Sequence, residues 1–351
     1  MINPWRTALQ AEIRRRYIHK ESAEWYDLTV SPSGLVNLAI VSDRFIGITY
    51  PERTAQVQAL IREHYAPAEI GFLTLYTIDE ARTLDMTPPP PAVDTAPVTW
   101  HDLALRAANQ SSVPLQRSRP AGRARTIAFY SFKGGVGRTT ALIHVAATLA
   151  RLGRKVVAVD LDLEAPGLGS AVTLREPRPS RGIVDFFYDR LYRPSGEAPT
   201  VEVSSVVGEV ELQAPGRFLV VPAGELSLDY VAKLDDLRAA ATTRQGDDLW
   251  AAFARDLTRH VEPDVILVDS RTGINQWGAL SLLRAADELV AFLYPNDQNR
   301  QGISLLLQSL AGLGTPTHVV FSPVPATDGP GLDRVRDQWR SLQHQLKGVT
   351  D

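Results

Sequence analysis

The residues with the clearest chemistry form a glycine-rich loop between a strand pattern and a helical pattern. The loop reads Lys133-Gly134-Gly135-Val136-Gly137-Arg138-Thr139-Thr140. Glycines let a backbone wrap around a polyphosphate and point its N–H groups at the oxygens. The N-terminus of the next helix adds a partial positive charge. The loop therefore predicts a polyphosphate site, and we favour this over a glycine-rich turn without a ligand.

Hydroxyl and carboxylate groups near this loop could bind a metal ion. Thr139 directly follows the basic residue of the loop, where its hydroxyl is placed to ligate Mg²⁺. Asp160 and Asp162 lie at the end of one apolar run, and Asp269 lies at the end of another. Ligand sites of parallel sheets lie at the carboxyl ends of the strands, so these acids are expected near the phosphates.

The elements that must position this loop read as alternating strands and helices. Apolar runs of strand length occur at residues 125–132, 155–162, 218–224, 264–270 and 288–294. Such continuous runs are typical of strands buried on both faces. Helical patterns separate them, the clearest at residues 139–153 and 247–261. This alternation predicts an α/β fold with a doubly wound, mostly parallel sheet.

Together these motifs resemble a known family. The stretch KGGVGRTT is followed by VVAVDLDLEAPGL and VILVDSRTG. This set is similar to the deviant Walker A ATPases of the ParA and MinD type, over about residues 124–325. The resemblance implies a P-loop ATPase domain that uses ATP and Mg²⁺, and the preference for adenine comes from the resemblance alone.

The resemblance also implies roles for single residues. Lys133 matches the lysine that reaches across a dimer interface to the partner's nucleotide. Asp162 matches the aspartate that positions the attacking water. Asp160 matches an acid near the Mg²⁺ shell and Asp269 the Walker B acid, so Thr139, Asp160 and Asp269 are the expected metal-site residues.

One residue of the loop departs from the family pattern. The usual loop reads GKTT, and here Arg138 stands in place of the lysine. Arginine carries five donors in a planar fork, so it can still hold phosphate oxygens, although it is bulkier. We count Arg138 among the catalytic residues and keep two hypotheses. The chain is an ATP-hydrolysing switch that forms a homodimer on ATP binding, or it is a nucleotide sensor with negligible turnover.

The run KGGVGR is similar to a variant subgroup of these ATPases. Members of this subgroup are often encoded in bacterial conflict or defence gene clusters.

Three further residues allow two interpretations each. Arg271 is an active-site cation or a surface salt-bridge partner, whereas Asn299 and Arg300 contact a partner subunit or DNA, or lie on a solvated surface.

Composition excludes several other classes of protein. The chain has 351 residues and no cysteine, so disulfides, thiolate zinc sites, Cys-ligated iron–sulfur clusters and cysteine nucleophiles are excluded. Its formal net charge of −3 gives no overall attraction to nucleic acid or anionic lipid. No apolar run is long enough to span a bilayer, and the N-terminus lacks the apolar core of a signal peptide. We expect a cytoplasmic protein.

A linker divides the chain. Residues 87–123 are rich in Pro, Ser, Gly and Arg, with four consecutive prolines that favour an extended chain. Within them, residues 100–108 could form a short helix. We therefore predict an N-terminal domain at residues 1–86 and a P-loop domain at residues 124–351.

The N-terminal domain reads as a small α+β unit of order α-β-β-α-β. Strands are expected at residues 35–42, 45–49 and 70–78, and a helix at residues 54–64 carries His64 on its apolar face as a packed core residue. The pattern is similar to BolA-like domains, which are related to the KH fold. The histidine that holds an iron–sulfur cluster in BolA proteins is missing, as is a GXXG loop. We expect a module that recruits an unknown protein partner.

Two other partners are less favoured. Basic clusters occur at residues 14–20 and 117–125, and a partition-type ATPase that binds DNA would need several phosphate contacts. The C-terminal segment has apolar residues at helical spacing, which could bind a membrane. We favour its packing onto the sheet instead; the residues are Leu332, Val335, Trp339, Leu342 and Leu346.

Overall fold

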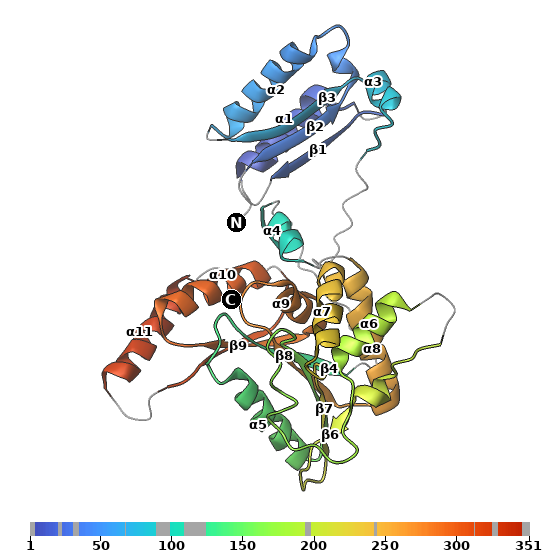
Figure 1. Cartoon of the computed structure of the whole chain (residues 1–351). Coiled ribbons are helices and arrows are strands. Elements are labelled where there is room, and N and C mark those ends of the chain that lie inside the picture. Colours follow the sequence, from blue (N-terminus) through green and yellow to red (C-terminus); the bar gives the residue numbers. More distant parts are fainter. Residues whose placement is uncertain are drawn as a thin grey trace. The chain divides into compact units, whose positions relative to one another are not determined.

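Figure 1 shows the computed structural model of the chain, which describes residues 4–19, 23–30, 35–66, 68–88, 99–108, 124–193, 198–241, 244–311, 313–324 and 329–345. The chain divides into two compact units. One comprises Met1–Thr95 with His101–Pro114, and the other comprises Ala96–Trp100 with Leu115–Asp351. Each unit has its own sheet and its own apolar core.

The first unit contains a three-stranded sheet with β2 in the centre, antiparallel to β1 and parallel to β3. The order α-β-β-α-β matches the predicted one, but its first two strands are not the two that were expected, and a short helix follows it. The elements are α1 (Pro4–Tyr17), β1 (Trp25–Val30), β2 (Val36–Val41), η1 (Asp43–Phe45), α2 (Tyr50–His64), β3 (Ile70–Tyr76) and α3 (Ile78–Thr83). The short helix α4 (Trp100–Ala108), which was expected in the linker, also forms.

Two details of this unit correct the prediction. The strand expected at residues 45–49 is wrong, because Phe45 ends a 3-10 helix and Gly47 has a φ of 78°. The missing strand is β1, which the sequence analysis left unassigned. His64 is half-buried rather than a core residue, and its Nδ1 lies 3.0 Å from the carbonyl oxygen of Leu60. The apolar face of α2 is instead buried through Val57, Leu60 and Ile61.

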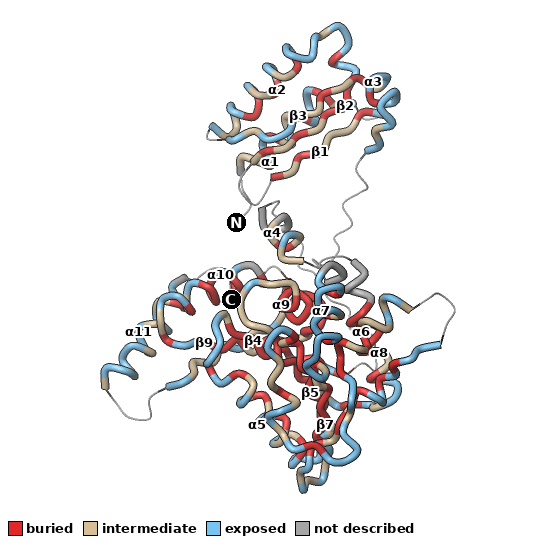
Figure 2. The backbone as a smooth tube through the Cα atoms, in the orientation of Figure 1, coloured by how far each residue is buried: buried red, intermediate tan, exposed pale blue. Residues whose placement is uncertain are grey.

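The second unit contains a seven-stranded sheet of order β10-β9-β4-β8-β5-β7-β6. All neighbouring pairs are parallel except β6 and β7, so the predicted mostly parallel α/β sheet is confirmed. Figure 2 shows that the central strands are almost continuously buried, as their apolar runs predict. The strands are β4 (Arg125–Ser131), β5 (Lys155–Leu161), β6 (Gly208–Glu209), β7 (Arg217–Val221), β8 (Val265–Ser270), β9 (Glu288–Leu293) and β10 (Thr317–Phe321).

Helices flank this sheet (Figure 1). Helix α5 follows the glycine-rich loop, packs on β4, β5, β7 and β8, and ends two residues before Gly153, whose φ is 82°. The helical elements are α5 (Arg138–Arg151), α6 (Ile183–Tyr192), η2 (Val203–Val206), α7 (Leu228–Ala241), α8 (Arg244–Val261), α9 (Gln276–Ala279), the π-helical η3 (Leu280–Ala285), α10 (Asp297–Ala311) and α11 (Pro330–Gln345).

The register of the central strands positions the site. Strand β8 lies between β4 and β5, so Asp160 of β5 pairs directly with Asp269 of β8. Strand β4 runs parallel to both and ends at Ser131, immediately before the loop. The glycine-rich loop and the acids therefore meet at the carboxyl edge of the sheet, where α/β folds bind ligands.

Candidate phosphate-binding site

The glycine-rich loop has the backbone conformation that its glycines allow. Gly135 and Gly137 have φ values of 78° and 76°, a left-handed region that disfavours side chains. Gly137 is the N-cap of α5, so the free N–H groups of the first helical turn face the loop. Val136 is buried and anchors the loop, whereas Gly134 and Gly135 are exposed. The backbone at Gly134 and Gly135 is therefore open to an anion.

Arg138 turns inward beneath the loop. Its side chain is only 7% exposed, and its Nε donates to Asp269 Oδ1 at 2.5 Å. Its Nη2 donates to Asp162 Oδ2 at 3.0 Å, and Nη1 lies 3.5 Å from the hydroxyl of Ser131. One guanidinium thus joins the carboxylates that end two neighbouring strands.

Thr139 and Asp269 lie together as the sequence predicts for a metal site. The Thr139 hydroxyl donates to Asp269 Oδ2 at 2.6 Å. Burial raises the pKa of Asp269, while Arg138 and Thr139 oppose that shift by stabilising the carboxylate. Mg²⁺ in nucleotide sites takes one or two protein ligands and fills the remaining positions with water and phosphate. The hydroxyl and carboxylate present here fit that requirement.

Asp160 is placed differently from the other predicted metal-site residues. It is 1% exposed and accepts backbone N–H groups from Asp162, Gly167 and Leu168 at 3.0–3.1 Å. Burial and the neighbouring Asp269 raise its pKa to about 7. Its oxygens therefore order the segment that carries Asp162. Across the described residues, no three carboxylate or imidazole groups gather into a site that holds a metal ion without a ligand's help.

Asp162 is held between two guanidiniums. Arg138 contacts one of its oxygens, and Arg271 Nη1 donates to the other at 3.0 Å. Arg271 also pairs with Glu164 at 2.8 Å, and Glu164 lies 3.6 Å from Arg238 of α7. Arg271 is therefore a salt-bridge partner of Asp162, and its role as an active-site cation stays a prediction.

Helix α7 supplies contacts that the sequence analysis missed. The Tyr230 hydroxyl donates to the carbonyl oxygen of Leu163 at 2.7 Å, and Arg238 reaches Glu164. Both contacts join α7 to residues 162–168. A lone tyrosine or arginine in a helix gives no sequence signal for such a role, because the contact depends on tertiary packing.

Comparison with known proteins agrees with this geometry. Residues 124–190 match the sequence model of a family described as AAA domain. The chain is 29% identical over 214 residues to the chromosome-partitioning ATPase Soj of Thermus thermophilus, covering 60% of this chain and 72% of Soj. It is 43% identical over 191 residues to an uncharacterized ATP-binding protein of Methanocaldococcus jannaschii, covering 54% and 60%. The second unit is therefore similar in sequence to ATPases of the ParA type.

Two further similarities complete the comparison. The antiactivator FleN of Pseudomonas aeruginosa is 30% identical over 168 residues, and the chain spans 49% of its length. Among solved structures, the septum site-determining protein MinD of Pyrococcus horikoshii with Mg-ADP has 18% identity and a TM-score of 0.46, covering 65% of this chain and 78% of MinD.

Lys133 of the glycine-rich loop does not join the buried cluster. Its side chain is exposed and has no hydrogen bond or ion pair to any residue that the structure describes. Gly273 donates its N–H to the carbonyl oxygen of Ser131 at 3.3 Å. This hydrogen bond holds the neighbouring Ile274, which is exposed, near the end of β4 that leads into the loop. An exposed cation and an exposed apolar side chain thus border the site. Thr140 is exposed in the first turn of α5.

Two predictions outside the loop are corrected or refined. Asn299 is 2% exposed, and its Nδ2 donates to Asn296 at 2.9 Å; the solvated-surface interpretation is therefore wrong for this residue. Arg300 is mostly covered and lies 3.4 Å from Asp297. Both residues belong to the first turn of α10.

The predicted packing of the C-terminal helix onto the sheet is wrong, because this helix packs mainly on another helix. Helix α11 contacts α10, Leu342 is fully buried, and Trp339 meets Phe321 of the edge strand β10. Leu346 lies outside the described residues. No helix in the described ranges has both the length and the apolar character to cross a membrane.

Proposed function

We propose that the chain binds ATP with Mg²⁺ and hydrolyses it as a switch that forms a homodimer. The observation that carries this proposal is the cluster beneath the loop, in which Arg138 bridges Asp162 and Asp269 while Thr139 donates to Asp269. All four residues come from the positions that the ParA/MinD pattern uses for phosphate, metal and water. A buried ion-pair cluster gives little net stability, because desolvation of its charges offsets their attraction, and this supports a functional role.

The loop and Arg138 would hold the phosphates. N–H groups at the start of α5 and the exposed backbone of Gly134 and Gly135 face the anion. Arg138 neutralises two carboxylates that would otherwise repel a polyphosphate. When phosphate oxygens arrive, its guanidinium can exchange Asp162 for them, because one fork fits carboxylate and phosphate alike.

Thr139 and Asp269 would hold Mg²⁺. The bound ion would neutralise charge on the β- and γ-phosphates. Asp162, once released by Arg138, would accept a hydrogen bond from the attacking water. Arg271 keeps one oxygen of Asp162 in place through this exchange. Asp160 supports the same segment from below through its bonds to backbone N–H groups.

Lys133 would act on the nucleotide of a second copy of the chain. Its exposure beside the loop, with no partner in the described part of its own chain, supports a role across an interface. Exposed apolar side chains on the loop before α7 and on its first turns, Leu226, Leu228 and Val231, would gain burial in such a dimer.

The N-terminal unit would recruit a protein partner. We keep the BolA-like resemblance as the basis for this expectation, together with a role in a bacterial conflict or defence system. Ile46 and Phe72 are 67% and 78% exposed, which is unusual for large apolar side chains of a small domain and supports a contact surface.

A nucleotide sensor with negligible turnover is the second candidate. It is favoured by Arg138, which engages both Asp162 and Asp269 and so stabilises the ground state of the site. A partition-type DNA-binding ATPase is the third, supported by the similarity to the chromosome-partitioning ATPase Soj. Steep salt dependence of nonspecific DNA binding would distinguish it.

Light scattering of the full chain with ATP–Mg²⁺ tests the switch. We expect the mass of the wild type to double and that of Lys133→Ala to stay monomeric, with Arg151→Ala as an exposed-cation control that dimerises normally. If nucleotide leaves wild type and Lys133→Ala equally monomeric, the switch is wrong. Steady-state phosphate release then separates hydrolysis from sensing, since a sensor binds ATP tightly and releases no phosphate.

A further inference from the structure

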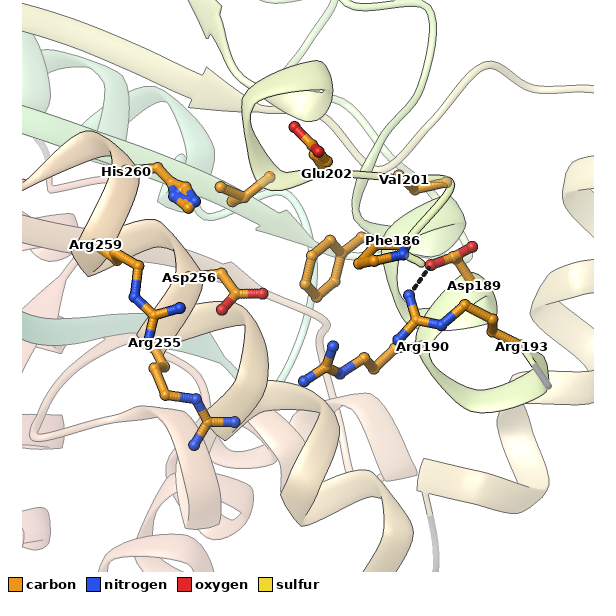
Figure 3. A pocket seen from close by; sticks show the side chains of 12 residues that line it. Phe186, Asp189, Arg190, Arg193, Val201, Glu202, Arg255, Asp256, Arg259 and His260 are labelled. Atoms are coloured by element: carbon orange, nitrogen blue, oxygen red, sulfur yellow. Dashed lines mark hydrogen bonds and ion pairs between the residues drawn. The ribbon is translucent and has the colours of Figure 1, made fainter. Parts of the chain in front are cut away.

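The second unit contains a cavity that is separate from the phosphate loop. It has a volume of about 310 Å³ and lies between the end of α6, residues 199–203 and the end of α8 (Figure 3). None of the residues of the glycine-rich loop or of the acid cluster lines it. This volume is near the lower end for pockets that bind small molecules, which begin at about 300 Å³.

One wall of the cavity is held together by an ion pair and hydrogen bonds. Asp189 pairs with Arg193 at 3.1 Å and accepts hydrogen bonds from the backbone N–H and the hydroxyl of Thr200. Arg181 donates to the carbonyl oxygen of Thr200 at 2.8 Å. The segment around residue 200 is therefore fixed to α6, and the charges of Asp189 and Arg193 are already satisfied.

The floor of the cavity is apolar. Phe186, Val201 and Val203 are 3%, 7% and 2% exposed. The Phe186 ring packs edge-to-face against Phe253 of α8, with ring centroids 5.3 Å apart. A planar ring of a ligand could lie against this floor, since offset and edge contacts of aromatic rings are favourable.

The rim carries charges that the fold itself does not use. Arg190, Arg255 and Arg259 have no hydrogen bond or ion pair within the described ranges, and neither has the half-buried carboxylate of Asp256. In Figure 3 this carboxylate points toward the Phe186 ring. The helix dipole explains basic residues in the last turns of α6 and α8, but not Arg255, nor a carboxylate between the guanidiniums.

We propose that this cavity binds a nucleoside monophosphate. Guanidiniums of Arg255 and Arg259 would hold the phosphate, because their planar forks match its oxygens. The base would lie on the Phe186 floor, and Asp256 would accept a hydrogen bond from its N–H groups or from the ribose hydroxyls. The mixed charge of the rim disfavours a bare polyanion, for which a carboxylate would be repulsive. This proposal does not depend on ATP hydrolysis at the loop.

Isothermal titration calorimetry of the full chain tests it, with AMP, GMP, CMP and UMP as the probes. A non-hydrolysable ATP analogue with Mg²⁺ is added first to fill the phosphate loop. We expect at least one monophosphate to bind with a Kd below about 1 mM in the presence of the analogue. Arg255→Ala with Arg259→Ala should weaken this binding at least about tenfold, and Arg190→Ala should weaken it less.

The matched control removes two exposed arginines elsewhere in the unit, Arg151→Ala with Arg154→Ala, and should bind as the wild type does. Three results would overturn the proposal. They are no saturable binding of any monophosphate, equal binding by the Arg255 and Arg259 double variant, and binding of inorganic phosphate as tight as that of the best monophosphate.

Discussion

Two buried arginines, one in each unit of the chain, show how the same side chain can serve structure or chemistry. Arg53 and Arg138 both have side chains that are only 7% exposed. Arg53 donates to the carbonyl oxygens of Ile48 and Leu75 at 2.9 and 3.0 Å and pairs with Glu80. The guanidinium carbon of Arg53 lies over the ring of Phe45, 5.5 Å from its centroid.

The partners of Arg138 differ in kind. They are the carboxylates of Asp162 and Asp269 and the hydroxyl of Ser131, all at the carboxyl edge of the sheet. The backbone carbonyl oxygens that bind Arg53 cannot move away from it without unfolding the unit. The side-chain carboxylates that bind Arg138 can be replaced by phosphate oxygens. The partners of a buried cation, more than its burial, therefore indicate whether a ligand can take their place.

The largest effect is expected from Arg138→Ala on nucleotide affinity. Because the phosphates lose their main side-chain cation, ATP–Mg²⁺ affinity should fall about 100-fold, or about 2.7 kcal/mol. Calorimetry measures it, with Arg151→Ala at the other end of α5 as the matched control. Wild-type affinity in Arg138→Ala would show that Arg138 is not the cation of the phosphate loop.

For Arg53→Ala we expect lost stability and unchanged nucleotide binding. The change leaves the carbonyl oxygens of Ile48 and Leu75 without their buried donor, which should lower the stability of the first unit by about 2–3 kcal/mol. Hydrogen exchange of α2 and β3 amides in the full chain measures this, and Arg62→Ala on the same helix is the exposed control. If amide protection is unchanged, the hydrogen bonds of Arg53 do not stabilise the first unit.

Arg138→Lys sharpens the comparison, because it keeps the charge and removes the fork. We expect ATP affinity within about tenfold, or about 1.4 kcal/mol. Single-turnover hydrolysis should become faster, because the broader fork binds the phosphates of the ground state, and ground-state binding does not speed chemistry. Slower hydrolysis in the lysine variant would assign the fork to the transition state instead.

The smallest expected effect is on the pH dependence of stability, and it comes from Glu80, the carboxylate that pairs with Arg53. Hydrogen bonds from Arg53 and from Thr77 lower the pKa of Glu80 from 4.5 to about 2. A depressed pKa stabilises the folded state above pH 4.5, and that stabilisation is lost as the pH falls toward 2. Because Glu80 is 44% exposed, solvent screening limits it to about 1 kcal/mol or less. Urea unfolding of wild type and Glu80→Gln should therefore differ at pH 6 and converge near pH 2.

The sequence predicts the second unit well because its signals are local. Runs such as that of β5 are apolar at every buried position except Asp160, and the loop lies between such a run and a helix. The contact of Arg271 with Asp162 could not be predicted, because it joins residues 109 positions apart through the strand order β8-β5. Asn299 reads as a surface residue, yet the first turn of α10 buries it.

The first unit was harder to predict for a physical reason. Residues 45–49 are apolar enough for a strand, but Gly47 turns the chain and Phe45 enters the core from a 3-10 helix. The true strand β1 contains Asp27 and Thr29 on its less buried face, so its pattern is weak. Pairing with β2 decides its conformation, and pairing is not a local property.

A crystal structure with a non-hydrolysable ATP analogue and Mg²⁺ tests the central claim most directly. The Arg138 guanidinium should leave Asp162 for phosphate oxygens, while Thr139 and Asp269 turn to the metal and Arg271 stays on Asp162. A guanidinium that still bridges Asp162 and Asp269, with nucleotide bound in the loop, would contradict the claim that Arg138 exchanges carboxylate for phosphate.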